Sequence, residues 1–284
     1  MVWRRRAECA VRILIASLPL TLPMLTTGCD STSSSVAVFA AAGAKPAIDE
    51  AAEKFQDQYG TKVEVSYGGG GEVLARMVLA ETGDVYLAPE QEFMESAVEQ
   101  GAVHPETIRS VAYMVPVIAV RKGNPKHVAA LSDLARPGIR VAITRPEATL
   151  LGKYAPEIFQ KAGLAEEIGE NIVTEAARPD LLATWLSLGE VDAVITWHFY
   201  EALAPHDIEV IPLPPEQLPG VGEMQAAVST YSKNPDLAES FVGFLASAEG
   251  KAVFGKHGYI VDAQELEKYW PSAAGGESSE REYE

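Results

Sequence analysis

Residues 36–43 read VAVFAAAG, a continuous apolar run that ends in small residues and a glycine. An uninterrupted apolar run of this length is typical of a strand that is buried on both faces, as in a parallel sheet. Pro46 follows and suits the first turn of a helix, where its missing N–H leaves no partner unsatisfied. A buried helix face is predicted by apolar residues at three- and four-residue steps: Ile48, Ala51, Ala52, Phe55 and Tyr59. Gly60 is expected to end this helix.

The rest of the folded part alternates short apolar runs with amphipathic segments. Strands are predicted at 62–66, 84–87, 115–120, 139–143, 191–196, 208–212 and 224–230. Helices are predicted at 72–81, 90–100, 149–162, 235–247 and 248–257. This alternation is typical of an α/β fold with largely parallel sheets. One large sheet is an alternative, but two lobes are favoured: residues 36–114 with 224–271 form one and residues 115–223 the other.

The two ends of the 284-residue chain have compositions that differ from the folded part. Residues 1–28 combine a basic start with an apolar run too short to span a bilayer, as in a secretory signal peptide. The sequence LTTGC at 25–29 resembles the lipobox of bacterial lipoproteins, which implies lipidation of Cys29. Polar residues 29–35 are interpreted as a tether. Residues 272–284, rich in Gly, Ser and Glu, predict a disordered tail.

The charge of the chain and its motifs exclude several classes of function. The net charge of −17 argues against a nucleic-acid-binding role, since such domains are basic. Histidine pairs at i, i+4 and a Gly-x-Ser-x-Gly motif are absent from the sequence, so no enzyme is expected. No cofactor is expected either. An anionic ligand would be repelled by the net charge, so its capture must depend on local dipoles and a few well-placed donors.

Four stretches of the chain, in this order, resemble the molybdate/tungstate-binding proteins of ABC importers. They are VFAAAG at 38–43, VSYGGGG at 65–71 with GDVYL at 83–87, LSDLARPGI at 131–139, and AEGKAVF at 248–254 with HGY at 257–259. The resemblance covers nearly all of the mature chain. It implies a type II periplasmic binding-protein fold, with two lobes joined by two crossing hinge strands and a ligand cleft between the lobes.

The resemblance also implies that hydroxyls and backbone N–H groups at helix starts hold a small oxyanion. Where the family carries serines, this chain has glycines, namely Gly43 and, between the second strand and its helix, Gly69 and Gly70. These glycines can offer only backbone N–H groups as ligand-binding donors. Restoring a hydroxyl by Gly70→Ser is expected to be tolerated.

Three further ligand-binding residues follow from the same comparison of motifs. The family's Pro-Ala-Gly matches residues 150–152, so the N–H of Leu151 is a candidate donor. A family backbone donor falls at Pro179, which has no N–H, and the neighbouring Arg178 is expected to compensate. The family's cleft tyrosine falls at Trp197, whose indole N–H can still donate.

The function implied is that of a monomeric, lipid-anchored binding protein in the periplasm or at the cell surface. It captures molybdate or tungstate by clamp closure and delivers it to an ABC permease in the membrane. One alternative is a receptor for another small anion or for a metal cation, which would use Glu147, His198 or tyrosines. Another is a sensory partner that signals the bound ligand to a kinase. An extracellular enzyme is the least favoured class.

Overall fold

The computed structural model describes residues 35–271. The predicted signal peptide, the predicted tail and the predicted lipidation site at Cys29 lie outside these residues. In the part of the chain that the structure describes, no helix combines the length and the apolar character needed to cross a membrane.

The first of two five-stranded sheets contains strands from both ends of the folded part. Its strand order is β2-β1-β3-β10-β4. The strands are β1 (Ser35–Ala41), β2 (Lys62–Gly68), β3 (Val85–Ala88), β4 (Arg109–Met114) and β10 (Gly222–Val228). β1 pairs in parallel with β2 and β3, as its apolar sequence predicts. β10 pairs antiparallel with β3 and β4, so the sheet is mixed rather than wholly parallel.

The second sheet is built from the middle of the chain alone. Its strand order is β7-β6-β8-β5-β9. The strands are β5 (Pro116–Arg121), β6 (Val141–Thr144), β7 (Ile172–Ala176), β8 (Ala193–Trp197) and β9 (Ile208–Pro212). β6 pairs in parallel with β7 and β8, whereas β5 pairs antiparallel with β8 and β9. This sheet is therefore mixed too.

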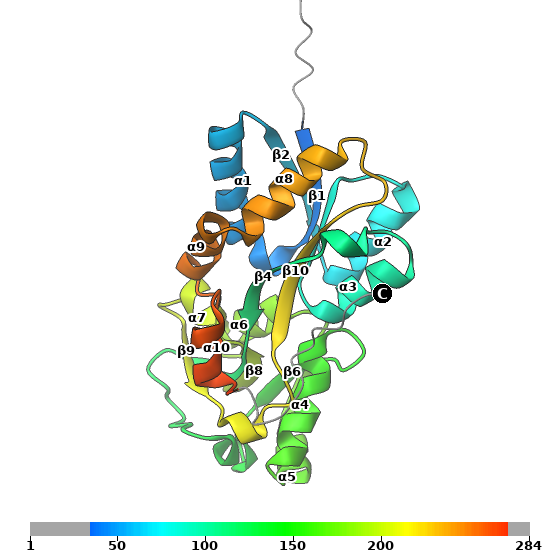
Figure 1. Ribbon diagram of the computed structural model, residues 1–284. Coiled ribbons are helices and arrows are strands. Elements are labelled where there is room, and N and C mark those ends of the chain that lie inside the picture. Colours follow the sequence, from blue (N-terminus) through cyan, green and yellow to red (C-terminus); the bar gives the residue numbers. More distant parts are fainter. Residues whose placement is uncertain (1–34, 272–284) are drawn as a thin grey trace, which may run out of the picture. The chain divides into compact units, whose positions relative to one another are not determined.

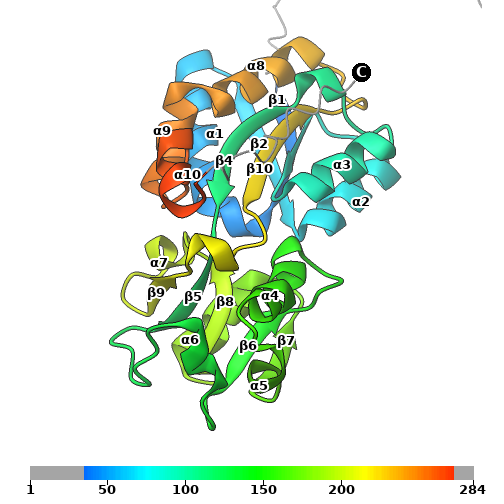
Figure 2. The ribbon, with the colours of Figure 1, turned by 60° about the horizontal axis from the view of Figure 1, so that its bottom comes forward.

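The chain crosses between the sheets twice. Only Val115 separates β4 from β5 on the outward crossing, and residues 213–221 connect β9 to β10 on the return. Figure 2 shows two lobes, each a sheet with its own helices, joined by these crossings. This is the two-lobed α/β fold of type II periplasmic binding proteins. The exact lobe boundaries at 115 and 223 stay a prediction, with which the sheet membership of each strand agrees.

Helices cover the sheets of both lobes (Figure 1). Those of the first lobe are α1 (Lys45–Tyr59), α2 (Gly70–Ala80), α3 (Gln91–Glu99), α8 (Pro235–Ala246), α9 (Ala248–Lys256) and α10 (Ala263–Tyr269). Those of the second are α4 (Leu150–Lys161), α5 (Ala165–Gly169), α6 (Pro179–Leu188) and α7 (Tyr200–Leu203). Within residues 35–271, short 3-10 helices lie at Ala42–Ala44, Pro105–Thr107, Leu131–Ala135 and Pro215–Gln217.

The buried face of α1 shows how the first lobe is held together. Ile48, Ala51 and Phe55 are fully buried, as their spacing predicts. The Phe55 ring packs edge-on against Phe241 of α8, with ring centroids 5.0 Å apart. Tyr59, predicted on the same face, is 52% exposed, so this part of the prediction is wrong. The reason is its position as the last residue of the helix, next to the point where the chain turns away from the core.

Candidate functional site

A cavity of about 370 Å³ lies between the two lobes. This volume is within the range of about 300–1,000 Å³ that is usual for small-molecule sites. From the first lobe its lining includes residues 41–44 and 68–72 with Pro89, Glu90 and Phe93, and from the second residues 147–149 and 177–180 with Trp197, Phe199 and Tyr200. The cavity therefore has walls on both sides of the crossing strands.

Three helices begin at this cavity. The first residue of α2 is Gly70, with Gly69 as its N-cap, and α6 begins at Pro179 after Arg178. α4 begins at Leu150, and its N-cap Thr149 accepts a hydrogen bond through Oγ1 from the N–H of Gly152 at 2.9 Å. A helix start presents unpaired N–H groups and the positive end of the helix dipole. Three such ends at one cavity favour a ligand with negative charge.

The structure brings five of the six predicted ligand-binding residues to the cavity. Its lining includes Gly43, Gly69, Gly70, Arg178 and Trp197. Leu151 is fully buried and does not line the cavity. The prediction concerned the backbone N–H of Leu151, but this residue belongs to the core of the second lobe and not to the cavity lining. The backbone of the preceding residue, Leu150, acts as a donor toward Glu90, which lines the cavity.

The glycines at the start of α2 differ in the space around them. The N–H of Gly69 donates to Glu72 Oε2 at 3.1 Å, and a Cβ atom added to Gly69 would meet nothing closer than 3.9 Å. A Cβ on Gly70 would lie 2.7 Å from Pro89 Cγ and 3.0 Å from the Phe93 ring. The expectation that Gly70→Ser is tolerated is therefore wrong, because the added atom meets packed side chains. Gly69 is the position where a side chain fits and points across the cavity toward Arg178.

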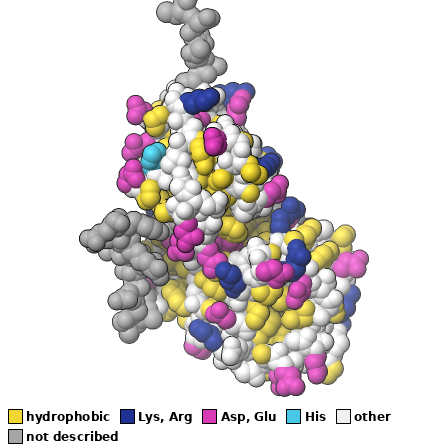
Figure 3. Space-filling model, turned by 90° about the vertical axis from the view of Figure 1, so that its right-hand side faces the viewer, with side chains coloured by type: hydrophobic (Ala, Val, Ile, Leu, Met, Phe, Trp, Pro, Cys, Tyr) yellow, Lys and Arg dark blue, Asp and Glu magenta, His cyan; other side chains and the backbone are white. Residues whose placement is uncertain are grey.

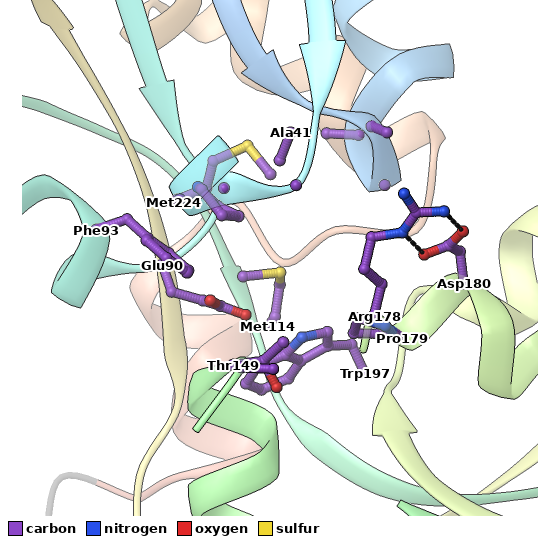
Figure 4. Close-up of a pocket in the computed structure, with 18 of the residues that line it drawn as sticks. Ala41, Glu90, Phe93, Met114, Thr149, Arg178, Pro179, Asp180, Trp197 and Met224 are labelled. Atoms are coloured by element: carbon purple, nitrogen blue, oxygen red, sulfur yellow. Dashed lines mark hydrogen bonds and ion pairs between the residues drawn. The ribbon is translucent and has the colours of Figure 1, made fainter. Parts of the chain in front are cut away.

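Arg178 reaches into the cavity but is already paired (Figure 4). Its Nε and one terminal nitrogen donate to the two carboxylate oxygens of Asp180 at 3.1 and 3.0 Å. This bidentate hydrogen bonding raises the pKa of Arg178 above its ordinary value. Both side chains remain about half exposed, with 47% and 46% of their surfaces accessible. The pair is therefore screened by water, and the guanidinium keeps donors that Asp180 does not use.

Glu90 is a cavity residue that motif comparison missed. It is the residue before α3, its side chain makes no capping hydrogen bond to that helix, and only 4% of its surface is exposed. Burial and the nearby charge of Glu92 raise the pKa of Glu90 to about 7. Hydrogen bonds from the Trp197 side chain and the Leu150 backbone act in the opposite direction. The only signal in the sequence is an acidic residue between a buried strand and a helix, and this signal says nothing of burial.

Glu147 and His198, the residues considered for a metal cation, are not arranged to bind one. Glu147 lies at the cavity with 73% of its side chain exposed and is 3.9 Å from Arg145. His198 does not line the cavity, and its Nδ1 accepts a hydrogen bond from the N–H of Val115 at 3.1 Å. Burial lowers the pKa of His198 to about 4. Among residues 35–271, no group of three or more histidine, cysteine or acidic side chains is placed to hold a metal ion.

Acidic side chains outnumber basic ones in the described lining of the cavity. The carboxylates belong to Glu72, Glu90, Glu147 and Asp180, and the guanidinium of Arg178 is the one basic group among the lining residues. Figure 3 shows that acidic side chains are also spread over one outer face of the molecule, with Lys and Arg among them. The cavity is therefore not a basic patch. A ligand anion must be held by helix starts, hydrogen bonds and the part of Arg178 that Asp180 leaves free.

Comparison with known proteins places this architecture in a family. The family model described as "Bacterial extracellular solute-binding protein" matches residues 36–260. A putative binding protein of Haemophilus influenzae is 28% identical over 226 residues, which cover 78% of this chain and 89% of that protein. The molybdate-binding protein ModA of Mycobacterium bovis is 27% identical over 228 residues, which cover 79% of this chain and 84% of that protein.

A solved structure supports the same assignment at the level of the fold. The sulfate-binding protein SubI of Mycobacterium tuberculosis superposes with a TM-score of 0.71 at 19% identity, covering 84% of this chain and 92% of that one. These relatives are binding proteins rather than enzymes, in agreement with the expectation from sequence. The chain therefore belongs to the bacterial extracellular solute-binding protein family and is the solute-binding component of an ABC importer.

Proposed function

We propose that this protein captures a tetrahedral oxyanion, molybdate or tungstate, by closing its two lobes around it, and delivers it to the ABC permease. The observation that carries the proposal is the convergence of three helix N-termini on one cavity. One of these helices, α2, belongs to the first lobe, and α4 and α6 belong to the second. An anion held by all three contacts both lobes and so stabilises the closed form, because only differential contacts shift such an equilibrium.

The relatives support the chemical class of the ligand. Proteins named for molybdate and for sulfate binding are both similar to this chain. Both anions are tetrahedral and accept hydrogen bonds at every oxygen. Sulfate therefore belongs in any test of the proposal beside molybdate and tungstate. The alternative of a metal cation has no support from the described residues, which contain no cluster of metal-binding side chains.

Molybdate, tungstate or sulfate is expected to raise the melting temperature of the purified protein, whereas chloride at matched ionic strength is not. At a ligand concentration of about 100 Kd the stabilisation is about 2.7 kcal/mol. For a chain of this size that corresponds to a shift of roughly 5–10 °C. Gly69→Val is expected to abolish the shift and to lower the melting temperature of the free protein only slightly, since Gly69 is the N-cap of α2 and valine is a poorer cap. Gly69 has extended backbone angles (φ −68°, ψ 150°) that valine adopts readily, and its side chain would enter the cavity.

Gly69→Ala is the matched control, since its single methyl group occupies less of the cavity and should leave most of the shift in place. A shift of wild-type size in Gly69→Val would place the ligand elsewhere. Closure is tested by small-angle X-ray scattering, in which the radius of gyration should fall when molybdate is added. An unchanged radius together with a measured thermal shift would argue against closure.

We infer the lipid anchor from residues that lie outside the described part of the chain. The mature protein is expected to begin at Cys29 and to remain with the membrane fraction, because two or three acyl chains at about 0.8 kcal/mol per buried CH₂ give stable anchoring. Cys29→Ser should release the protein in soluble form or leave the signal peptide uncut. Fractionation of this variant against wild type tests the inference, and identical fractionation would refute it.

A further inference from the structure

Glu90 places a carboxylate where the second lobe offers its hydrogen-bond donors. The residue lies between β3 and α3 of the first lobe, and its side chain points into the cavity (Figure 4). The Trp197 side chain, at the end of β8, and the backbone of Leu150, at the start of α4, both act on it as donors that lower its pKa. Two of the donors that an anion would use in the second lobe are thus directed at a carboxylate from the first.

Carboxylates of the protein also lie at the other two helix starts, but those carboxylates are exposed. Glu72 accepts from the N–H of Gly69, and Asp180 accepts from Arg178. Both acidic side chains face water, so a ligand anion can displace them at little cost. The Glu90 carboxylate cannot move into water in this way, because it is buried among packed side chains. A second full negative charge beside an ionised Glu90 would be strongly disfavoured at this depth.

We propose that Glu90 is a further ligand-binding residue of the cleft, and that a fully deprotonated oxyanion is captured only together with one proton, which the Glu90 carboxyl group carries. The proton comes from solvent and binds a carboxylate oxygen of Glu90. The neutral carboxyl group then releases the Trp197 and Leu150 donors to the anion and donates its own O–H to an anion oxygen. This inference rests on the proposed function, since it assumes that the ligand is an oxyanion.

The groups around Glu90 set the pH range in which anion binding is accompanied by proton uptake. Glu92, on α3, raises the pKa of Glu90 by its like charge, and Lys153, on α4, lowers it. These two side chains pair with each other across the lobes at 2.5 Å, and the smaller effect of Lys153 offsets part of that of Glu92. Burial therefore dominates, and in the free protein the Glu90 carboxyl group changes its protonation near neutral pH.

Three tyrosines face Glu90 from the other elements packed around it. They are Tyr86 of β3, Tyr154 of α4 and Tyr200 of α7. Burial and neighbouring carboxylates, Glu90 among them, raise the pKa of each above its ordinary value. The tyrosines therefore stay neutral in the range where Glu90 titrates. The remaining charges of the lining belong to Glu72, Glu147 and the Arg178–Asp180 pair.

Calorimetric titration of the full mature protein with sodium molybdate and with sodium sulfate tests the proposal, because neither anion takes up a proton between about pH 6 and about pH 9. In the wild type, Kd should be nearly constant below about pH 7 and rise about tenfold per pH unit above it. Repeating the titration at about pH 8 in two buffers of different ionisation enthalpy should show close to one proton taken up per anion.

Glu90→Gln keeps the size of the side chain but cannot titrate, so its Kd should not depend on pH and its proton uptake should be close to zero. Glu157→Gln, which removes an exposed carboxylate of α4 outside the cavity, should behave as the wild type. Binding to wild type without proton uptake would overturn the inference and leave the proposed function intact. So would a pH dependence that persists in Glu90→Gln. If neither anion binds any variant at any pH, the proposed function itself is wrong, and the inference falls with it.

Discussion

Gly152→Ala is expected to lower the free energy of unfolding by about 3 kcal/mol and to abolish the stabilisation by oxyanions. Gly152 lies in the first turn of α4, where the helix approaches the end of β6. A Cβ atom there would overlap the carbonyl oxygen of Arg145 and lie 2.9 Å from that of Thr144. Both are backbone atoms, which cannot rotate away as a side chain can. The helix start must therefore move, and with it the N–H groups that it presents to the cavity.

Gly243→Ala is the matched control, because Gly243 also lies within a helix, α8, and a Cβ there would meet nothing within 4 Å. This substitution is expected to raise the free energy of unfolding by about 0.5–1 kcal/mol through helix propensity alone. Urea unfolding followed by circular dichroism measures both effects. Opposite signs are expected for the two glycine-to-alanine changes. Equal unfolding midpoints would show that the close approach of α4 to residues 144–145 does not limit the fold.

Glu90→Gln is expected to remove a fall in stability that the free wild-type protein shows as the pH rises toward 8. Burial raises the pKa of Glu90 from 4.5 to about 7, so the folded chain holds this proton more tightly than the unfolded chain does. The resulting stabilisation is fully present below about pH 4.5 and is lost as the pH rises through about 7. The shift of the Glu90 pKa from 4.5 to about 7 corresponds to about 3 kcal/mol of folding stability.

The measurement is urea unfolding without ligand at about pH 5 and about pH 8, compared between Glu90→Gln and wild type. Taking the difference between the two proteins removes the contributions of groups that titrate equally in both. Among these is His198, whose lowered pKa makes it destabilise the fold as the pH falls below about 6.5. The variant should gain stability relative to wild type at the higher pH. Parallel pH profiles would mean that folding does not raise the pKa of Glu90.

Much of the fold could be predicted from the sequence, because the information that fixes each element is local. The apolar run of β1 and the spacing of Ile48, Ala51 and Phe55 report burial directly. Gly60 ends α1 in a left-handed conformation, with φ 67°, that glycine adopts readily. The motifs also located the cavity, since Gly69 and Arg178 stand at helix starts and line it. Helix starts after strands can be read from sequence because caps and breaks in periodicity depend on neighbouring residues.

The state of the candidate donors depended on contacts between residues that are far apart in the chain. Periodicity could not show that Glu90 meets Trp197 and Leu150, because this depends on how one lobe is placed against the other. Nor could the motif show that a Cβ on Gly70 would meet Pro89. The sequence alone therefore determined which elements form and which of their ends carry donors. Only the tertiary structure decided that a buried carboxylate lies beside two of those donors, because burial and electrostatics depend on atoms brought together by folding rather than on residues adjacent in the chain.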